Sequence, residues 1–211
     1  MTDPDELVSA KNLKGQQLTP GGKRWFPRRT LNWLRKRRQG VNEKSIRTKR
    51  EPLRLRALRE ARKDLYVRER GGNNRGPEVD KIILENDGVL GEPWCGDAVA
   101  RWYRKAGSKS VQRAWAATRS LGRLAGMSVL PDQRVGRPGD IVVFNFAGGH
   151  LDSDHTGLLI RYCNETGRSR RAHTATHVKT IDGNSNVGGG QGVGYQTRQI
   201  SLVNRVVRVT R

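Results

Sequence analysis

The chain has 211 residues with 41 Lys and Arg against 20 Asp and Glu, so its formal net charge is +21. No stretch approaches the roughly 18 apolar residues of a membrane span, and two cysteines exclude a disulfide framework or a four-cysteine zinc site. The charge favours anionic partners of some kind: nucleic acid, lipid head groups or bacterial wall polymers.

The charge is divided unevenly along the chain. Residues 1–63 carry 19 basic and 6 acidic side chains, and residues 64–211 carry 22 and 14. Leu, Ile, Val and Phe make up 12 of 63 residues in the first part and 34 of 148 in the second. Low aliphatic content with high net charge is typical of disorder. We therefore predict a basic N-terminal arm, residues 1–52, that is partly disordered or helical, followed by one globular domain, residues 53–211.

The arm mixes aromatic and basic side chains. Trp25, Phe26 and Trp33 stand among lysines and arginines, a pattern that suits stacking combined with phosphate contact. An alternative is a solvated basic tail whose aromatics dock on the domain. The N-terminus starts acidic and lacks an apolar segment, so we expect no secretory signal peptide and synthesis in a host cytoplasm.

Four helical stretches are predicted before residue 125. The first begins at Glu51 and ends before Gly71-Gly72, the second follows Pro77, the third covers 95–106, and a further stretch covers 111–124. Leu55, Leu58, Arg62 and Leu65 are expected to share one face of the first helix. The expected apolar stripe of the third is Ala98, Val99, Trp102, Tyr103 and Ala106.

Strands are predicted after Pro138-Gly139, where β-branched and aromatic residues alternate with turn residues. The expected ranges are 141–146, 155–162, 173–181 and 203–210. Helices first and strands second predict an α+β fold with an antiparallel sheet.

Cys95 is the most informative residue of the chain. It stands at the predicted start of the third helix, where unpaired N–H groups and the helix dipole stabilise a thiolate, the nucleophilic form of cysteine. Gly96 removes bulk beside the sulfur, whereas Glu92 and Asp97 are nearby anions that oppose thiolate formation. The alternative is a small buried hydrophobic residue.

A catalytic cysteine needs a base, and His155 opens a predicted strand, where it can face a helix N-terminus. His150 lies in a Gly-rich loop and is expected at the surface. His173 and His177 would share a strand face about 13 Å apart, which disfavours a metal site, so we predict no metal and no cofactor. Cys163, at the end of its strand, is expected to be inert.

Asp182 and Asn184 follow at the end of the next predicted strand. They are two residues apart, so both would point to one side and either could orient the imidazole. An ordinary Asp-Gly turn is the alternative interpretation.

The order of these residues, Cys on a helix, His on a strand and Asp or Asn at the next strand's end, is that of papain-like cysteine hydrolases. The chain most closely resembles the CHAP amidase and peptidase domains of phage and bacterial wall-lytic proteins. The resemblance covers roughly residues 55–209 and leaves the arm unexplained. The matching segments are GGNNRGPEVDKII, GEPWCGDAVARW, RPGDIVVF, HTGLLI, TIDGNSN and the Gly-rich GGGQGVG.

The resemblance implies a papain-like fold, with helices packed on an antiparallel sheet, and a role for each matched residue. Cys95 matches the nucleophile and His155 the general base. Asp182 matches a position that is usually Glu, and Asn184 matches the Asn two residues later. A papain-type Gln six residues before the nucleophile is absent, because Val89 stands there, so the oxyanion hole is expected to use the Cys95 N–H and a second donor.

These observations predict a peptidoglycan hydrolase that cuts an amide, either at the sugar–peptide junction or within the peptides. It would reach the wall after membrane lesion or inside a virion, and its arm would contact an anionic polymer. Two rivals are a polymer- or DNA-binding protein on a degenerate scaffold, and a virion structural or tail protein in contact with other virion proteins.

Overall fold

A six-stranded antiparallel sheet organises the part of the chain that the structure, a computed structural model, describes: residues 51–146 and 154–210. The strand order is β1-β6-β2-β3-β4-β5. The strands are β1 (Met127–Val129), β2 (Ile141–Phe144), β3 (His155–Cys163), β4 (His177–Asn186), β5 (Gln191–Gln199) and β6 (Val203–Val209). The predicted α+β class with an antiparallel sheet is confirmed.

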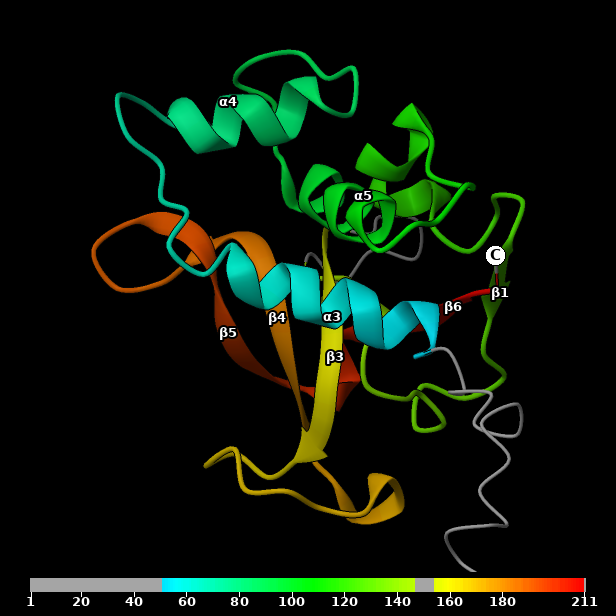
Figure 1. Ribbon diagram of the computed structural model, residues 1–211. Coiled ribbons are helices and arrows are strands. Elements are labelled where there is room, and N and C mark those ends of the chain that lie inside the picture. The colour runs from blue at the N-terminus through cyan, green and yellow to red at the C-terminus, as the bar shows by residue number, and fades with distance from the viewer. Residues whose placement is uncertain (1–50, 147–153, 211) are drawn as a thin grey trace, which may run out of the picture. The chain divides into compact units, whose positions relative to one another are not determined.

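Within the described residues, three α-helices precede the strands: α3 (Leu53–Lys63), α4 (Pro77–Leu84) and α5 (Cys95–Lys105). Helices α3 and α5 pack on each other, and α5 also packs against β3 and β4 (Figure 1). The second and third predicted helices are confirmed, and all five residues of the apolar face expected for the third are buried. No helix in the described ranges is long and apolar enough to cross a membrane.

Both faces of the sheet are covered by apolar side chains. In β2, Ile141 and Val143 belong to the larger core under the helices. Val142 and Phe144 belong to a second cluster on the opposite face. This alternation follows from the two-residue period of a strand, and it explains why β2 reads as a continuous apolar run.

The first predicted helix is shorter than expected and presents a different face. Helix α3 ends at Lys63 because the next residue, Asp64, turns inward, where its carboxylate accepts a hydrogen bond from Trp102 Nε1 at 2.9 Å. The buried residues of α3 are Ala57, Leu58 and Ala61, whereas Arg62 is exposed. The prediction omitted the two alanines from the buried face because their small side chains carry a weak hydropathy signal.

The predicted helix over 111–124 is wrong. The segment holds two short 3₁₀ turns instead, η2 (Arg113–Ala116) and η3 (Thr118–Ser120). Trp115 lies in η2 and Leu121 directly follows η3, and both are fully buried in the core without a continuous helix.

The predicted strands differ from the observed ones mainly at the two edges of the sheet. Strands β1 and β5 were not expected, and β4 begins at His177 rather than His173, which lies in the 3₁₀ turn η4 (Ala172–Thr174). Strand β4 continues to Asn186 because β5 pairs with it from His177↔Gln199 to Asn186↔Gln191. The TIDGNSN segment is therefore strand rather than a turn.

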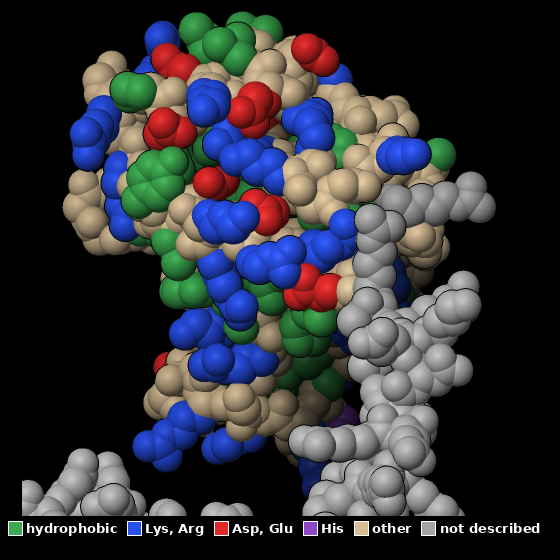
Figure 2. Space-filling model, in the orientation of Figure 1, with side chains coloured by type: hydrophobic (Ala, Val, Ile, Leu, Met, Phe, Trp, Pro, Cys, Tyr) green, Lys and Arg blue, Asp and Glu red, His purple; other side chains and the backbone are tan. Residues whose placement is uncertain are grey.

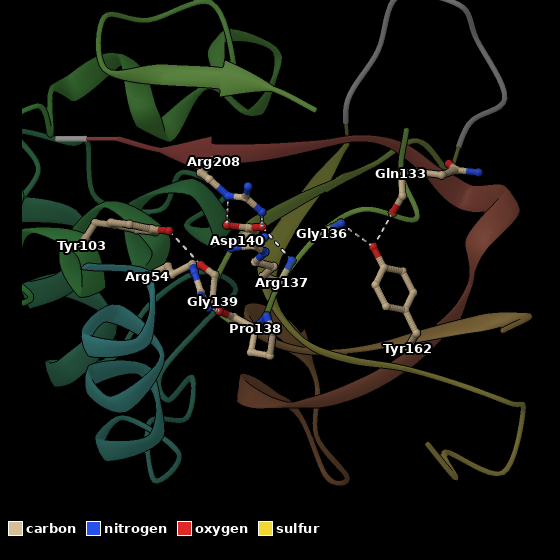
Figure 3. A network of polar contacts seen from close by, with 10 residues as sticks. All are labelled: Arg54, Tyr103, Gln133, Gly136, Arg137, Pro138, Gly139, Asp140, Tyr162 and Arg208. Carbon is tan, nitrogen blue, oxygen red and sulfur yellow. Dashed lines mark hydrogen bonds and ion pairs between the residues drawn. The ribbon is translucent and has the colours of Figure 1, made fainter. Parts of the chain in front are cut away.

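The Pro-Gly-Asp turn before β2 ties several elements together (Figure 3). The buried Asp140 carboxylate accepts hydrogen bonds from the Arg137 N–H at 2.7 Å and from Arg208 Nη2, on β6, at 2.6 Å. Tyr103 of α5 donates its hydroxyl hydrogen to the Gly139 carbonyl at 2.8 Å. Gly139 has a φ of +88° and packs so closely on α3 that a Cβ would lie 2.0 Å from the Arg54 carbonyl oxygen. The motif therefore holds a helix–sheet junction.

Replacing Asp140 by asparagine should destabilise the domain without removing any group of the candidate site described below. The variant leaves the Arg208 guanidinium facing an uncharged amide in a buried position, and breaking such a pair costs about 2–4 kcal/mol. Urea unfolding followed by circular dichroism measures the change. A loss below about 0.5 kcal/mol would contradict the role given to this turn.

Candidate active site

Cys95 is the first residue of helix α5, and its side chain is almost completely buried. The first backbone hydrogen bond of the helix runs from the Ala98 N–H to the Trp94 carbonyl at 2.9 Å. No side chain caps this end, so the N–H groups of the first turn are available to negative charge beside the sulfur.

His155 is the first residue of β3 and pairs with Phe144 of β2 in the sheet register. Its side chain is buried, and its Nε2 lies 3.0 Å from Asp182 Oδ2. Burial lowers the imidazole pKa, but the hydrogen bond to Asp182 and a further interaction with the Cys95 thiol outweigh it and raise the pKa to about 9. At neutral pH the ring is an imidazolium whose Nε2–H donates to Asp182, which leaves Nδ1 for the sulfur.

Asp182 is fully buried in β4, opposite Gly157 of β3. Its Oδ2 also accepts a hydrogen bond from Arg198 Nη1. Burial raises the pKa of the Asp182 carboxyl, but the His155 hydrogen bond and the Arg198 charge outweigh burial and hold that pKa below its usual range. The carboxyl is therefore ionised, and it orients the imidazolium.

Asn184 does not share this role, because the backbone bulges between Asp182 and Ser185 and Asn184 has a φ of +50°. The expectation that the two side chains point to one side assumed a regular strand. With the Asn184 amide assigned so that both of its ends are satisfied, its nitrogen donates to Glu69 Oε1 at 3.2 Å and its oxygen accepts from the Trp94 N–H at 3.2 Å, and neither contact is with His155. Asn184 therefore holds Trp94, the residue before Cys95.

A polar cluster around Glu69 fixes the loop that leads to Cys95. One Glu69 oxygen accepts a hydrogen bond from Trp94 Nε1 and the other from the Asn74 N–H, both at 2.9 Å. Asn74 Nδ2 donates to the Gly91 carbonyl at 3.0 Å. The GGNN segment therefore supports the loop that leads to Cys95.

The two anions near Cys95 are both engaged by Arg113. The guanidinium binds both Glu92 oxygens at 2.6 and 2.7 Å and approaches Asp97 Oδ1 to 3.4 Å. Burial raises the pKa of Asp97 to about 6, although a hydrogen bond from Asn86 opposes it. Arg113 therefore reduces the unfavourable effect that we expected Glu92 and Asp97 to have on a thiolate.

A cleft of about 560 Å³ opens beside Cys95. Its lining is Glu92, Pro93, Cys95, Arg113, Ala114, Ala116, Ala117, Thr118, Arg119 and Asp154. Gly96 is required on the side of η2, because a Cβ there would lie 2.3 Å from the Ala116 carbonyl oxygen. The small residues of η2 thus form one wall directly on the first turn of α5.

The remaining candidates lie apart from this site. His173 is exposed, Cys163 is fully buried with a pKa raised by burial, and no group of three or more potential metal ligands occurs in the described part of the chain. His150 lies outside the described residues. Val89, at the papain-type Gln position, is 70% exposed and carries no donor.

Two site residues were not predicted from the sequence: Gly157 and Arg198. Gly157 follows His155 by two in the HTG segment, and a small residue at that spacing was the available signal. Arg198 lies on β5, a strand that we did not predict because the glycines at its start favour a loop.

A comparison with models of protein families and a comparison with curated proteins each found no match to this chain.

Proposed function

We propose that the chain is a cysteine hydrolase with a papain-like, CHAP-type domain that cleaves an amide of bacterial peptidoglycan. The observation that carries the proposal is the row formed by the Cys95 thiol at a helix N-terminus, the His155 ring and the buried Asp182 carboxylate. The sequence resemblance supplies the substrate class.

The first half of the reaction uses the thiolate–imidazolium pair. The Cys95 sulfur attacks the amide carbonyl carbon, and the oxyanion forms near the backbone N–H groups of the first turn of α5. The His155 imidazolium gives its proton to the departing amine nitrogen as the carbon–nitrogen bond breaks. The products are a thioester on Cys95 and a free amine.

The second half returns the enzyme to its starting state. The neutral imidazole of His155, still oriented by Asp182, removes a proton from water as the water oxygen attacks the thioester carbon. The carbon–sulfur bond then breaks, which releases a carboxylic acid and restores the thiolate beside the imidazolium. The reaction consumes one water for each amide cut.

The charge on the surface of the domain supports an anionic binding partner. Lys and Arg side chains are spread over the face that carries α3, with acidic side chains among them (Figure 2). Residues 64–211 hold 22 basic and 14 acidic side chains, which favours approach to teichoic acids or similar wall polymers by a salt-screened attraction. The arm would add to this attraction, and the protein would act at the wall after membrane lesion or from a virion.

Selective alkylation tests whether the site is built for nucleophilic chemistry. Iodoacetamide should label Cys95, which lines the cleft, at least about 100-fold faster than Cys163, which is fully buried with a raised thiol pKa. Peptide mass spectrometry after timed labelling gives both rates, and Cys163→Ser serves as the matched control. Equal labelling of the two thiols would count against catalysis and favour a binding protein.

Mass spectrometry of purified wall digested with the protein tests the substrate and identifies the bond. Cleavage at the sugar–peptide junction releases peptides with a new alanine amine, whereas endopeptidase cleavage leaves the peptides on the glycan. Absence of any soluble fragment from several wall types would end the proposal.

A further inference from the structure

Arg198 takes no part in the proposed reaction steps. It is on β5, one strand beyond Asp182, and its side chain is 15% exposed. Its Nη1 donates to Asp182 Oδ2, the same oxygen that accepts from His155 Nε2 at 3.0 Å. A single carboxylate oxygen therefore joins two cations.

Aromatic rings fix the guanidinium in this position. Its central carbon lies 5.1 Å from the centre of the Phe144 ring and 5.4 Å from that of Phe146. The Phe146 ring in turn stacks on the His155 ring with centres 5.8 Å apart. Cation–π contact and the shared oxygen together make Arg198 part of the same packed unit as the imidazole.

The buried Asp182 carboxylate has a cation on each side. Asp182 is fully buried, and a buried charge that lacks a partner is costly. The His155 ring of β3 and the Arg198 guanidinium of β5 both contact Asp182 Oδ2. The three groups therefore form a row of alternating charges across β3, β4 and β5.

We propose that Arg198 is a positioning residue of the catalytic site, which holds the Asp182 carboxylate against His155 and limits how firmly that carboxylate retains the imidazolium proton. The inference rests on the proposed function for its catalytic meaning, but the arrangement of charges is independent of the substrate. Because the leaving amine must receive its proton from His155, a moderate hold on that proton favours turnover.

The groups that act on the His155 proton come from each element around it. Asp182 on β4 and the Cys95 thiol on α5 raise the imidazole pKa. β2 contributes the uncharged Phe144 ring, and Asp154, the preceding residue, lines the cleft. Arg198 is the cation on the far side of Asp182, and its removal takes away one of the two cations that share the carboxylate oxygen.

Histidine NMR titration of the full chain tests the proposal without any substrate. In wild type, His155 should titrate near pH 9, and in Arg198→Met its pKa should rise by about one unit or more because a neighbouring positive charge is lost. Arg198→Lys, which retains the charge, should titrate within a few tenths of a unit of wild type. His155→Gln identifies the resonance among the four histidines.

Arg161→Met is the matched control. Arg161 lies on β3 and binds the Gly167 carbonyl at 3.0 Å, away from the site, so its loss should leave the His155 titration unchanged. Wall lysis by Arg198→Met should fall about 10- to 100-fold, with its alkaline limit displaced upward.

An unchanged His155 titration in Arg198→Met would overturn the proposal, because a packing role alone does not alter a proton affinity. If Arg198→Met does not fold, Arg198→Lys decides: a wild-type titration supports the charge, and a displaced one overturns it. If wild type lyses no wall but the titration moves as expected, the proposed function fails while the role of Arg198 stands.

Discussion

Replacement of Cys95 by alanine should reduce wall lysis by a factor of at least about 10⁴, because removal of a covalent nucleophile eliminates the step on which both halves of the reaction depend. That factor corresponds to about 5.5 kcal/mol of lost transition-state stabilisation. The fall in turbidity of a wall suspension measures the rate. The fold should persist, since the change removes one sulfur atom at the start of α5 and costs on the order of 1 kcal/mol.

Cys163→Ala is the matched control for this prediction. Cys163 is also buried, at the end of β3 remote from His155 along the strand, so its replacement tests the general effect of losing a buried thiol. Its lysis rate should stay within about threefold of wild type. Retained lysis in Cys95→Ala, or an equal loss in both variants, would refute the assignment of the nucleophile.

The helices show what local pattern can and cannot predict. Helix α5 was predicted almost to the residue because its stripe of large apolar residues is strong and a glycine follows it. Helix α3 was predicted with the wrong face, since Ala57 and Ala61 pack closely on other elements without a strong hydropathy signal. The end of α3 at Lys63 depends on the Asp64–Trp102 hydrogen bond. This contact joins residues far apart in sequence.

The prediction of the strands was incomplete for a related reason. Strand β5 begins among glycines, which favour loops when the sequence is considered alone. In the structure Gly192 and Gly194 lie beside close neighbours: a Cβ on Gly192 would approach the Val67 carbonyl oxygen to 2.4 Å. These glycines mark close packing of strand and loop, and only the paired strand β4 makes that evident.

The candidate site follows the same division. Residue type and order along the chain were enough to select Cys95, His155 and the pair Asp182 and Asn184, and the structure brings the first three together. The choice between Asp182 and Asn184 depended on a β-bulge and a positive φ, neither of which the segment reveals. Arg198 required the position of β5, so no local pattern pointed to it.

The space for the Asp182 carboxylate is created by a glycine on the neighbouring strand β3. Gly157 of β3 and Gly194 of β5 both pair with Asp182 in the sheet register. A Cβ on Gly157 would lie 1.9 Å from Asp182 Oδ1 and 2.9 Å from the Ile181 carbonyl oxygen. The carboxylate therefore occupies the volume that any other residue at position 157 would fill.

Gly157→Ala should therefore displace the Asp182 carboxylate and reduce lysis about 10²- to 10³-fold, comparable to the loss of an orienting group. The His155 pKa should fall from about 9 toward 6.5, since the Asp182 hydrogen bond is the largest influence that raises it. In wild type the raised pKa contributes stability that is complete below about pH 6.5 and is lost as the pH rises through 9. In Gly157→Ala the free energy of unfolding should not show this decline. Urea unfolding at pH 6 and pH 9.5 measures the difference.

Gly194→Ala separates displacement of the carboxylate from general crowding of the sheet. A Cβ there would approach Val187 Cγ1 to 2.2 Å, so the crowding falls on a side chain outside the catalytic row. This variant should lose stability by about 1–3 kcal/mol, as overpacked positions do, but retain the wild-type His155 titration. If Gly157→Ala also keeps a His155 pKa near 9, the carboxylate is not displaced and the need for glycine at this position has another cause. If Gly194→Ala lowers that pKa equally, crowding of β4 from either side moves Asp182, and the specific role of Gly157 is lost.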